Sequence, residues 1–181
     1  MIQKNTRETR QSIIDACLWM NSSGLNQGTS GNISVFTDEG ILITPSSLPY
    51  EETQPEDIVL LPGDGLLGEA VGRHRPSSEW KFHADIYNKR DDIHSVVHTH
   101  SIYATALSML RKDIPSVHYM IGVFGGDSIR CADYAHYGSK ELSENALIAL
   151  QDRTGCLLGT HGMIACGGDL KQALWRAGEL E

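Results

Sequence analysis

Short apolar segments with strand character alternate along the chain with longer segments of helical periodicity, and this order restricts the fold more than any other feature. Apolar residues at helical spacing predict helices over residues 6–23, 77–90, 102–110, 138–152 and 169–181. Short apolar runs predict strands over residues 32–36, 40–44, 57–61, 94–100, 156–159 and 162–167. The alternation favours an α/β architecture in which helices cover one mixed sheet.

Length and charge exclude several classes of protein. The chain has 181 residues, which is the size of one domain, and we treat residues 1–181 as a single domain. The net charge is −8, and no run of Lys or Arg marks a surface for nucleic acid or for an anionic membrane. Residues 1–11 lack the apolar core of a signal peptide, and no apolar stretch approaches the roughly 20 residues that span a bilayer.

The four cysteines agree with a protein of the cytoplasm. They lie far apart in the sequence, at Cys17, Cys131, Cys156 and Cys166, and form no CxxC pair. Such spacing argues against a cysteine zinc site and predicts reduced, mostly buried thiols. We therefore expect a cytoplasmic location, with neither nucleic acid nor membrane as a partner.

Three histidines beside strands indicate a metal site. His98 and His100 form an HTH triplet at a strand end, and residues two apart on a strand point to the same face. His161 lies in a Gly-flanked turn between two apolar strands, which is a rigid place for a ligand. Three imidazole ligands with one open position are typical of catalytic zinc sites. We predict such a site at these three residues; for the HTH pair alone, two polar residues at a strand end is the alternative.

A glutamate and four further histidines are weaker candidates. Glu79 lies at the start of the second expected helix, where the helix dipole lowers the pKa of a carboxyl. It is a candidate fourth ligand or acid–base group, and the alternative is an ordinary glutamate of a first helical turn. His94 shares the parity of the HTH pair, whereas His74, His83 and His136 stand in polar sequence and are expected at the surface.

Three turns of small residues are candidates for binding an anion. They are GTSGN at residues 28–32, TPSS at 44–47 and PSSE at 76–79. Each offers backbone N–H groups and hydroxyls to a phosphate, although turns of this kind occur in every protein. The third turn is contiguous with Glu79, so the sequence predicts a phosphate pocket beside the metal.

Taken together, these motifs resemble one known family. The segments GTSGNIS, ILITPSSLPYE, PSSEWKFH, VVHTHS, HYMIGVFGG and THGMIACG follow one another as in the class II aldolase/adducin family, over essentially the whole chain. The resemblance implies an α/β fold of three layers, with a central mixed, mainly antiparallel sheet flanked by helices. It also implies a Zn²⁺ cofactor, with Mn²⁺ or Co²⁺ as alternatives, and a homotetramer whose active sites lie between subunits.

The resemblance also implies roles for individual residues. The implied metal ligands are Glu79, His98, His100 and His161, and Glu79 is in addition the implied acid–base residue. The implied phosphate contacts are Gly31, Asn32, Ser46, Ser47, Ser77 and Ser78. Tyr119 is expected to reach a neighbouring subunit's site as a proton donor, and Tyr137 is also expected to face a neighbour's site.

The chain departs from the family pattern in a few places. Ser47 stands where the family usually has Gly, and Thr160 stands where it usually has Asn or Gln. The C-terminal helix and the tail that follows it in the family are apparently incomplete at Glu181. Val123 and Phe124 are bulkier than the usual residues and are expected, with Tyr137, to shape the aldehyde side of the site.

The activity that the resemblance implies is metal-dependent retro-aldol cleavage. The substrate would be a small phosphorylated sugar, a ketose 1-phosphate: 5-deoxypentulose, 5-methylthioribulose or fuculose 1-phosphate. The products would be dihydroxyacetone phosphate and an aldehyde. The alternatives on the same fold are a pentulose-phosphate 4-epimerase, a methylthioribulose-1-phosphate dehydratase and a non-catalytic, adducin-like interaction domain.

Overall fold

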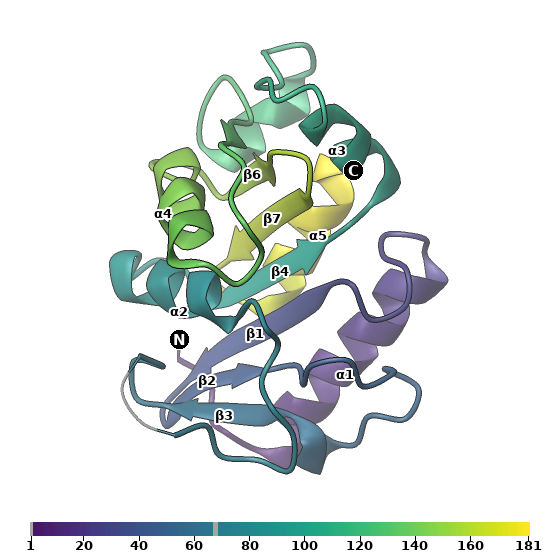
Figure 1. Cartoon of the computed structure of the whole chain (residues 1–181), viewed down its shortest axis with the longest axis vertical. Helices are drawn as coiled ribbons and strands as arrows, with labels where there is room; N and C mark the ends of the chain where they lie inside the picture. The colour runs from purple at the N-terminus through teal and green to yellow at the C-terminus, as the bar shows by residue number, and fades with distance from the viewer. Residues whose placement is uncertain (1, 67–68) are drawn as a thin grey trace.

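The centre of the molecule is a twisted seven-stranded sheet, seen in Figure 1 running across a computed structural model that describes residues 2–66 and 69–181. The strands are β1 (Asn32–Thr37), β2 (Gly40–Ile43), β3 (Val59–Pro62), β4 (Ser95–Thr99), β5 (Cys131–Ala132), β6 (Gly155–Leu158) and β7 (Gly162–Gly167). Their order is β3-β2-β1-β4-β7-β6-β5, and only β5 and β6 are parallel. The expected mixed, mainly antiparallel sheet is confirmed.

Helices cover both faces of this sheet. They are α1 (Arg7–Ser22), α2 (Trp80–Lys89), α3 (Ile102–Ser108), α4 (Lys140–Ala149) and α5 (Leu170–Leu180), with short 3-10 helices η1 (Pro55–Asp57) and η2 (Tyr119–Phe124). One apolar core joins the sheet to α1, α3 and α5, and a second joins it to α2 and α4. Three of the predicted helices begin after a capping residue: the side chains of Thr6, Ser139 and Asp169 accept hydrogen bonds from backbone N–H groups of the first turn. Within the described ranges, no helix has both the length and the apolar character to cross a membrane.

The alternation of side chains along the strands decides which layer receives the polar residues. On β1, Ile33 packs into the core beneath α1 and α5, whereas Ser34 points to α2. On β4, Val97 belongs to the first core and Val96 to the second. Since successive side chains of a strand face opposite sides, His98 faces α2 together with Val96. The polar face of β1 and β4 therefore lies under the start of α2.

The ends of a few elements differ from the sequence prediction. Helix α2 begins at Trp80 rather than Ser77, with Glu79 as its N-cap residue. Strand β3 begins two residues after the expected Asp57, because Pro55 starts a 3-10 turn there. The two-residue strand β5 and the 3-10 helix η2 were not predicted, since segments this short have no readable hydrophobic period.

The four cysteines agree with their prediction. Cys17, Cys156 and Cys166 are buried free thiols, and Cys131 is a half-buried one. Burial raises the pKa of the Cys166 thiol to about 12, so this side chain is a neutral part of the core.

Candidate metal centre

Three strand ends meet at one edge of the sheet and bring the candidate ligands together. Antiparallel pairing places Asn32 at the start of β1 opposite His98 on β4, and Met163 of β7 opposite Thr99. His100 directly follows β4, and His161 directly precedes β7. The three histidine rings consequently lie within 4.8 to 4.9 Å of one another, centroid to centroid. The predicted triad is thus assembled by the register of β4 and β7.

Glu79 completes a four-residue cluster from the start of α2. Its Oε2 lies 3.1 Å from His98 Nε2, and its Oε1 lies 3.3 Å from His161 Nε2. His100 Nε2 is 3.1 Å from His98 Nε2, and the four donor atoms all lie within 4.8 Å of one another. Zinc–nitrogen bonds of about 2.0–2.1 Å in a tetrahedron separate neighbouring ligand atoms by about 3.3 Å. The cluster therefore has the dimensions of a first-row divalent metal site.

The hydrogen bonding of the cluster also fits a cation. His98 Nδ1 lies 2.9 Å from the carbonyl oxygen of Met163, which only accepts, so the neutral ring has its proton on Nδ1. The Nε2 lone pair of His98 then faces the carboxylate of Glu79. Glu79 Oε1 is buried and has no hydrogen-bond partner among the described residues. Converging lone pairs without donors are stabilised by a bound metal ion, and the residues present fit one.

The electrostatics of the cluster favour the protonation states that metal ligands need. Burial raises the pKa of Glu79, but its close interactions with His98, His161 and Asn32 outweigh burial and bring this pKa far below its usual range. The direction agrees with the sequence prediction, while the cause lies in these partners rather than in the helix dipole alone. Burial lowers the pKa of both His100 and His161 to about 4, so both rings are neutral at pH 7.

Two glycines allow the strands to approach one another at the cluster. A Cβ at Gly31 would lie 2.6 Å from the carbonyl oxygen of His98, and a Cβ at Gly162 would lie 2.4 Å from that of Thr99. Both contacts are with backbone, which cannot move aside cheaply. Gly31, expected to contact phosphate, thus has a clear packing role beside the His98 backbone; its phosphate contact stays a prediction.

A cavity of about 370 Å³ opens beside the cluster. Its lining residues are Thr29, Ser30, Ser78, Glu79, His100, Tyr134, Ala135, Tyr137, Thr160 and His161. Thr29 and Ser30 come from the GTSGN turn, so that turn does face the site, although sequence reasoning selected its later residues. Tyr134 was missed, because an aromatic residue in a polar segment has no distinguishing pattern. The cavity can place a small polar molecule against Glu79, His100 and His161.

The TPSS and PSSE turns lie side by side. The backbone N–H of Ser46 donates to Arg75 O at 2.9 Å, and that of Ser77 donates to Thr44 O at 2.9 Å. Ser46, Ser47 and Ser78 are exposed, and Ser77 is buried with its hydroxyl accepting from the N–H of Glu79. The two turns are therefore close enough to form one phosphate pocket, as predicted. Their contacts with a phosphate remain predictions.

Asn32 and His83 occupy places that the sequence did not predict. The side chain of Asn32 is turned inward, where its amide donates to Glu79 Oε2 at 3.0 Å. His83 was expected at the surface, and this prediction is wrong: the ring is fully buried and contacts Asn32 Oδ1 through Nε2. It lies one helical turn beyond Glu79, on the face of α2 that packs on the sheet. His94 lies at the opposite end of β4 beside Phe36 and is not part of the cluster.

The three aromatic residues predicted to border the site lie in different places. Tyr119 lies on η2 with 83% of its surface exposed and does not line the cavity of its own chain; its contact with a neighbouring subunit stays a prediction. Tyr137 lines the cavity of its own chain, although it was expected to face a neighbour's site. The expectation for Phe124 is wrong for this chain, because its ring is buried in the core against Gly155.

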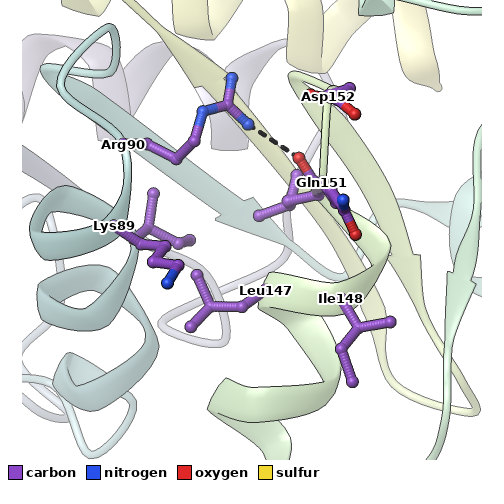
Figure 2. A pocket seen from close by; sticks show the side chains of 8 residues that line it. Lys89, Arg90, Leu147, Ile148, Gln151 and Asp152 are labelled. Atoms are coloured by element: carbon purple, nitrogen blue, oxygen red, sulfur yellow. Dashed lines mark hydrogen bonds between the residues drawn. The ribbon is translucent and has the colours of Figure 1, made fainter.

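A second cavity, of about 390 Å³, lies between α2 and α4, away from the cluster. Figure 2 shows Leu147 of α4 pointing toward Lys89 of α2, whereas Ile148 points away from Lys89. Arg90 at its rim is held by a 2.8 Å hydrogen bond to the carbonyl oxygen of Leu150. Its walls are mostly apolar. The possible metal ligands found among the described residues are Glu79 and the three histidines, which lie at the first cavity. The chemistry-bearing side chains therefore gather at the first cavity.

Known relatives share both sequence and fold with this chain. The L-fuculose phosphate aldolase of Escherichia coli strain K12 is 49% identical over 169 residues, which cover 93% of this chain and 77% of the relative. The 5-methylthioribulose-1-phosphate/5-deoxyribulose-1-phosphate aldolase of Rhodospirillum rubrum is 46% identical, over 95% of this chain and 76% of the relative. A solved structure of an L-fuculose 1-phosphate aldolase superimposes with a TM-score of 0.91 at 38% identity, covering 97% of this chain and 82% of that one.

The family model agrees with these similarities. The model described as the class II aldolase and adducin N-terminal domain matches residues 11–181. The match includes β1, the start of α2, β4 and β7, which together supply every member of the cluster. On the sequence match, the shared fold and the assembled glutamate–histidine cluster, the chain belongs to the class II aldolase and adducin family.

Proposed function

We propose that the protein catalyses the metal-dependent retro-aldol cleavage of a ketose 1-phosphate to dihydroxyacetone phosphate and an aldehyde. The observation that carries the proposal is the convergence of Glu79 with three histidine nitrogens beside a cavity bordered by the GTSGN and PSSE turns. The named relatives, which are aldolases of fuculose phosphate and of 5-deoxyribulose and 5-methylthioribulose 1-phosphates, support the same reaction. The family also includes adducin domains. The presence of all four residues of the cluster therefore favours an aldolase over a non-catalytic, adducin-like domain.

Glu79, His98, His100 and His161 would hold the metal ion. Nitrogen and carboxylate donors of this number favour Zn²⁺, with Mn²⁺ or Co²⁺ as alternatives. When bound, a divalent ion supplies a Lewis acid that stabilises the negative charge developing on the substrate's carbonyl oxygen. The GTSGN, TPSS and PSSE turns would bind the phosphate. The contacts, all implied by the family resemblance, would come from Gly31, Asn32, Ser46, Ser47, Ser77 and Ser78.

The acid–base role belongs to Glu79. Its Oε1 is buried and has no hydrogen-bond partner among the described residues, so its lone pairs are available to a metal ion or to a proton of the substrate. In the condensation direction, this oxygen removes a proton from the carbon of dihydroxyacetone phosphate that bears the free hydroxyl; in cleavage it returns the proton. Tyr119 of a neighbouring subunit would exchange a proton with the substrate's C4 oxygen, and Tyr137 would border the bound sugar.

A homotetramer is part of the proposal. Large apolar side chains are exposed on α3 and on the segment that follows it, at Tyr103, Met109, Leu110, Val117 and Tyr119. Exposed apolar residues gathered on one stretch of chain are typical of protein–protein interfaces. Covering this segment with a second copy would bring Tyr119 to another subunit. A cytoplasmic location remains part of the same proposal, consistent with the four free thiols.

The direct test is incubation of purified protein with fuculose, 5-deoxyribulose and 5-methylthioribulose 1-phosphates. Dihydroxyacetone phosphate is measured with a coupled dehydrogenase, before and after chelation and with Zn²⁺ restored. We expect cleavage of at least one substrate, loss of cleavage on chelation and recovery with Zn²⁺. Full activity after metal removal would contradict the proposal. An epimer, a dehydrated product or no reaction would instead indicate the epimerase, the dehydratase or the adducin-like domain.

A further inference from the structure

A row of buried polar side chains leads from Glu79 into the layer between α2 and the sheet. Asn32 Nδ2 lies 3.0 Å from Glu79 Oε2, and Asn32 Oδ1 contacts His83 Nε2. Ser34 Oγ lies 2.7 Å from His83 Nδ1 and 2.7 Å from the hydroxyl of Tyr87. All five side chains are buried, with at most 7% of any of them exposed. We call Asn32, His83, Ser34 and Tyr87 the buried chain.

The chemistry of the groups sets the direction of every hydrogen bond in the buried chain. An ionised Glu79 only accepts, so the amide nitrogen of Asn32 faces it and the amide oxygen faces His83. His83 Nε2 must then donate, which leaves Nδ1 as an acceptor for the hydroxyl of Ser34. The Ser34 oxygen in turn accepts from Tyr87. All donors therefore point toward Glu79, an arrangement in which each hydrogen bond polarises and strengthens the next.

Two rigid elements hold the buried chain in place. Glu79, His83 and Tyr87 are spaced four residues apart, so they share one face of α2 and its N-cap. Asn32 and Ser34 are alternate residues of β1 and face that helix. The face of α2 thus meets the polar face of β1 at every step of the buried chain.

Phe82 adds a lateral support. Its ring stacks on His83 at 4.5 Å between centroids and meets the edge of His98 at 5.5 Å. No member of the buried chain lines the cavity beside the metal cluster. His83, Ser34 and Tyr87 therefore act on the reaction only through Asn32 and Glu79.

We propose that the buried chain is a positioning device for the catalytic carboxylate, in which His83, Ser34 and Tyr87 orient Asn32 so that it binds Glu79 Oε2 and keeps Oε1 directed at the reacting carbon. This inference rests on the proposed function for the role of Glu79. It assigns a purpose to a buried histidine and a buried tyrosine that no step of the reaction uses. It also explains why both ends of the Asn32 amide are occupied inside the protein.

The first test removes one hydroxyl and compares it with a matched hydroxyl outside the buried chain. Ser34→Ala breaks the hydrogen bonds to His83 and to Tyr87. Ser95→Ala removes an equally buried hydroxyl of neighbouring β4 that has no hydrogen-bond partner among the described residues. We expect kcat to fall about 10-fold in Ser34→Ala, a loss of about one hydrogen bond. KM and bound zinc should match the wild type, and Ser95→Ala should keep wild-type kcat.

A second pair of variants tests His83 itself. His83→Met removes both ring nitrogens, and His83→Gln keeps an amide donor for Asn32 in a side chain of similar length. We expect kcat to fall by about 10- to 100-fold in His83→Met and to recover in part in His83→Gln, as for other residues that orient metal-site groups. A purely structural role would lower the yield and thermal stability of both variants without separating their kcat values.

A spectroscopic readout keeps the proposal testable whatever the substrate is. Nitrogen-15 NMR of histidine-labelled wild-type protein, with His83 assigned through His83→Gln, should show the neutral tautomer protonated at Nε2. Protonation at Nδ1, or a Ser34→Ala enzyme with the kcat of Ser95→Ala, would overturn the inference. If the wild type cleaves no ketose 1-phosphate, the proposed function fails, and the tautomer still decides whether the buried chain is directed at Glu79.

Discussion

At the residue scale, the two carboxylate oxygens of Glu79 have different surroundings. Oε2 accepts a hydrogen bond from Asn32, whereas Oε1 is buried without a hydrogen-bond partner among the described residues. Glu79→Gln keeps the shape and removes the base, so proton exchange at dihydroxyacetone phosphate should fall by about 10²- to 10⁴-fold. Metal content should persist, because the three histidines remain. Exchange is measured in deuterium oxide by NMR with exposed Glu141→Gln as the control, and retained exchange would contradict the base role.

His83 makes the stability of the fold depend on pH. Burial, together with the charge of His98, lowers the pKa of His83 from 6.5 to about 3, so between these values the unfolded chain binds a proton that the folded chain does not. The free energy of unfolding should therefore decrease as pH falls from 6.5 toward 3, by up to about 1.4 kcal/mol per pH unit from this residue. His83→Gln removes the contribution. Urea titrations between pH 7 and 4 should show a shallower pH dependence for the variant; equal slopes would contradict the assignment.

At the element scale, the turn between β6 and β7 stores strain next to His161, a candidate metal ligand. Thr160 has a φ of +56°, a left-handed conformation that β-branched residues rarely adopt, and Asn favours it. Ser47, the other departure from the family pattern, has a φ of +61°. Thr160→Asn should raise the free energy of unfolding by about 1 kcal/mol while the turn still presents His161. The free energy of unfolding is measured by urea titration. Thr160→Val, which keeps a β-branched residue and therefore the strain, is the control, and equal stability of the two variants would argue against strain.

At the scale of the whole molecule, assembly should depend on the exposed segment that follows α3. Val117 is 73% exposed there, and a charge placed in a buried apolar interface is costly. In the proposed tetramer, Val117→Asp should shift the assembly toward smaller species in sedimentation velocity at micromolar concentration. It should also lower activity, because the proposed contact of Tyr119 with a neighbouring subunit's site would be lost. Ile148→Asp, on α4 and 69% exposed, is the control and should sediment like the wild type. An unchanged sedimentation coefficient for Val117→Asp would exclude this segment as the interface.

Local pattern located the helices and the longer strands of this protein and selected the candidate metal ligands. Helical periodicity located α1 and α5 to within a residue or two, because this signal repeats at every turn of a helix. The HTH spacing and the Gly-flanked His161 identified the triad, because strand geometry alone places i and i+2 on one face. Glu79 and the GTSGN turn were found as candidates for the same reason: their signals are contiguous in sequence.

Only the tertiary structure decided how these parts meet. The burial of His83, in a segment that reads as polar, follows from the packing of α2 on β1, and no local period carries that information. The inward turn of Asn32, the cavity wall at Tyr134 and the removal of Phe124 into the core depend on contacts between residues far apart in the chain. Local sequence signals were enough to predict the α/β elements and the types of candidate ligand. The register of β1, β4 and β7 decided the site, because side chains converge only after long-range pairing sets which strand ends lie side by side.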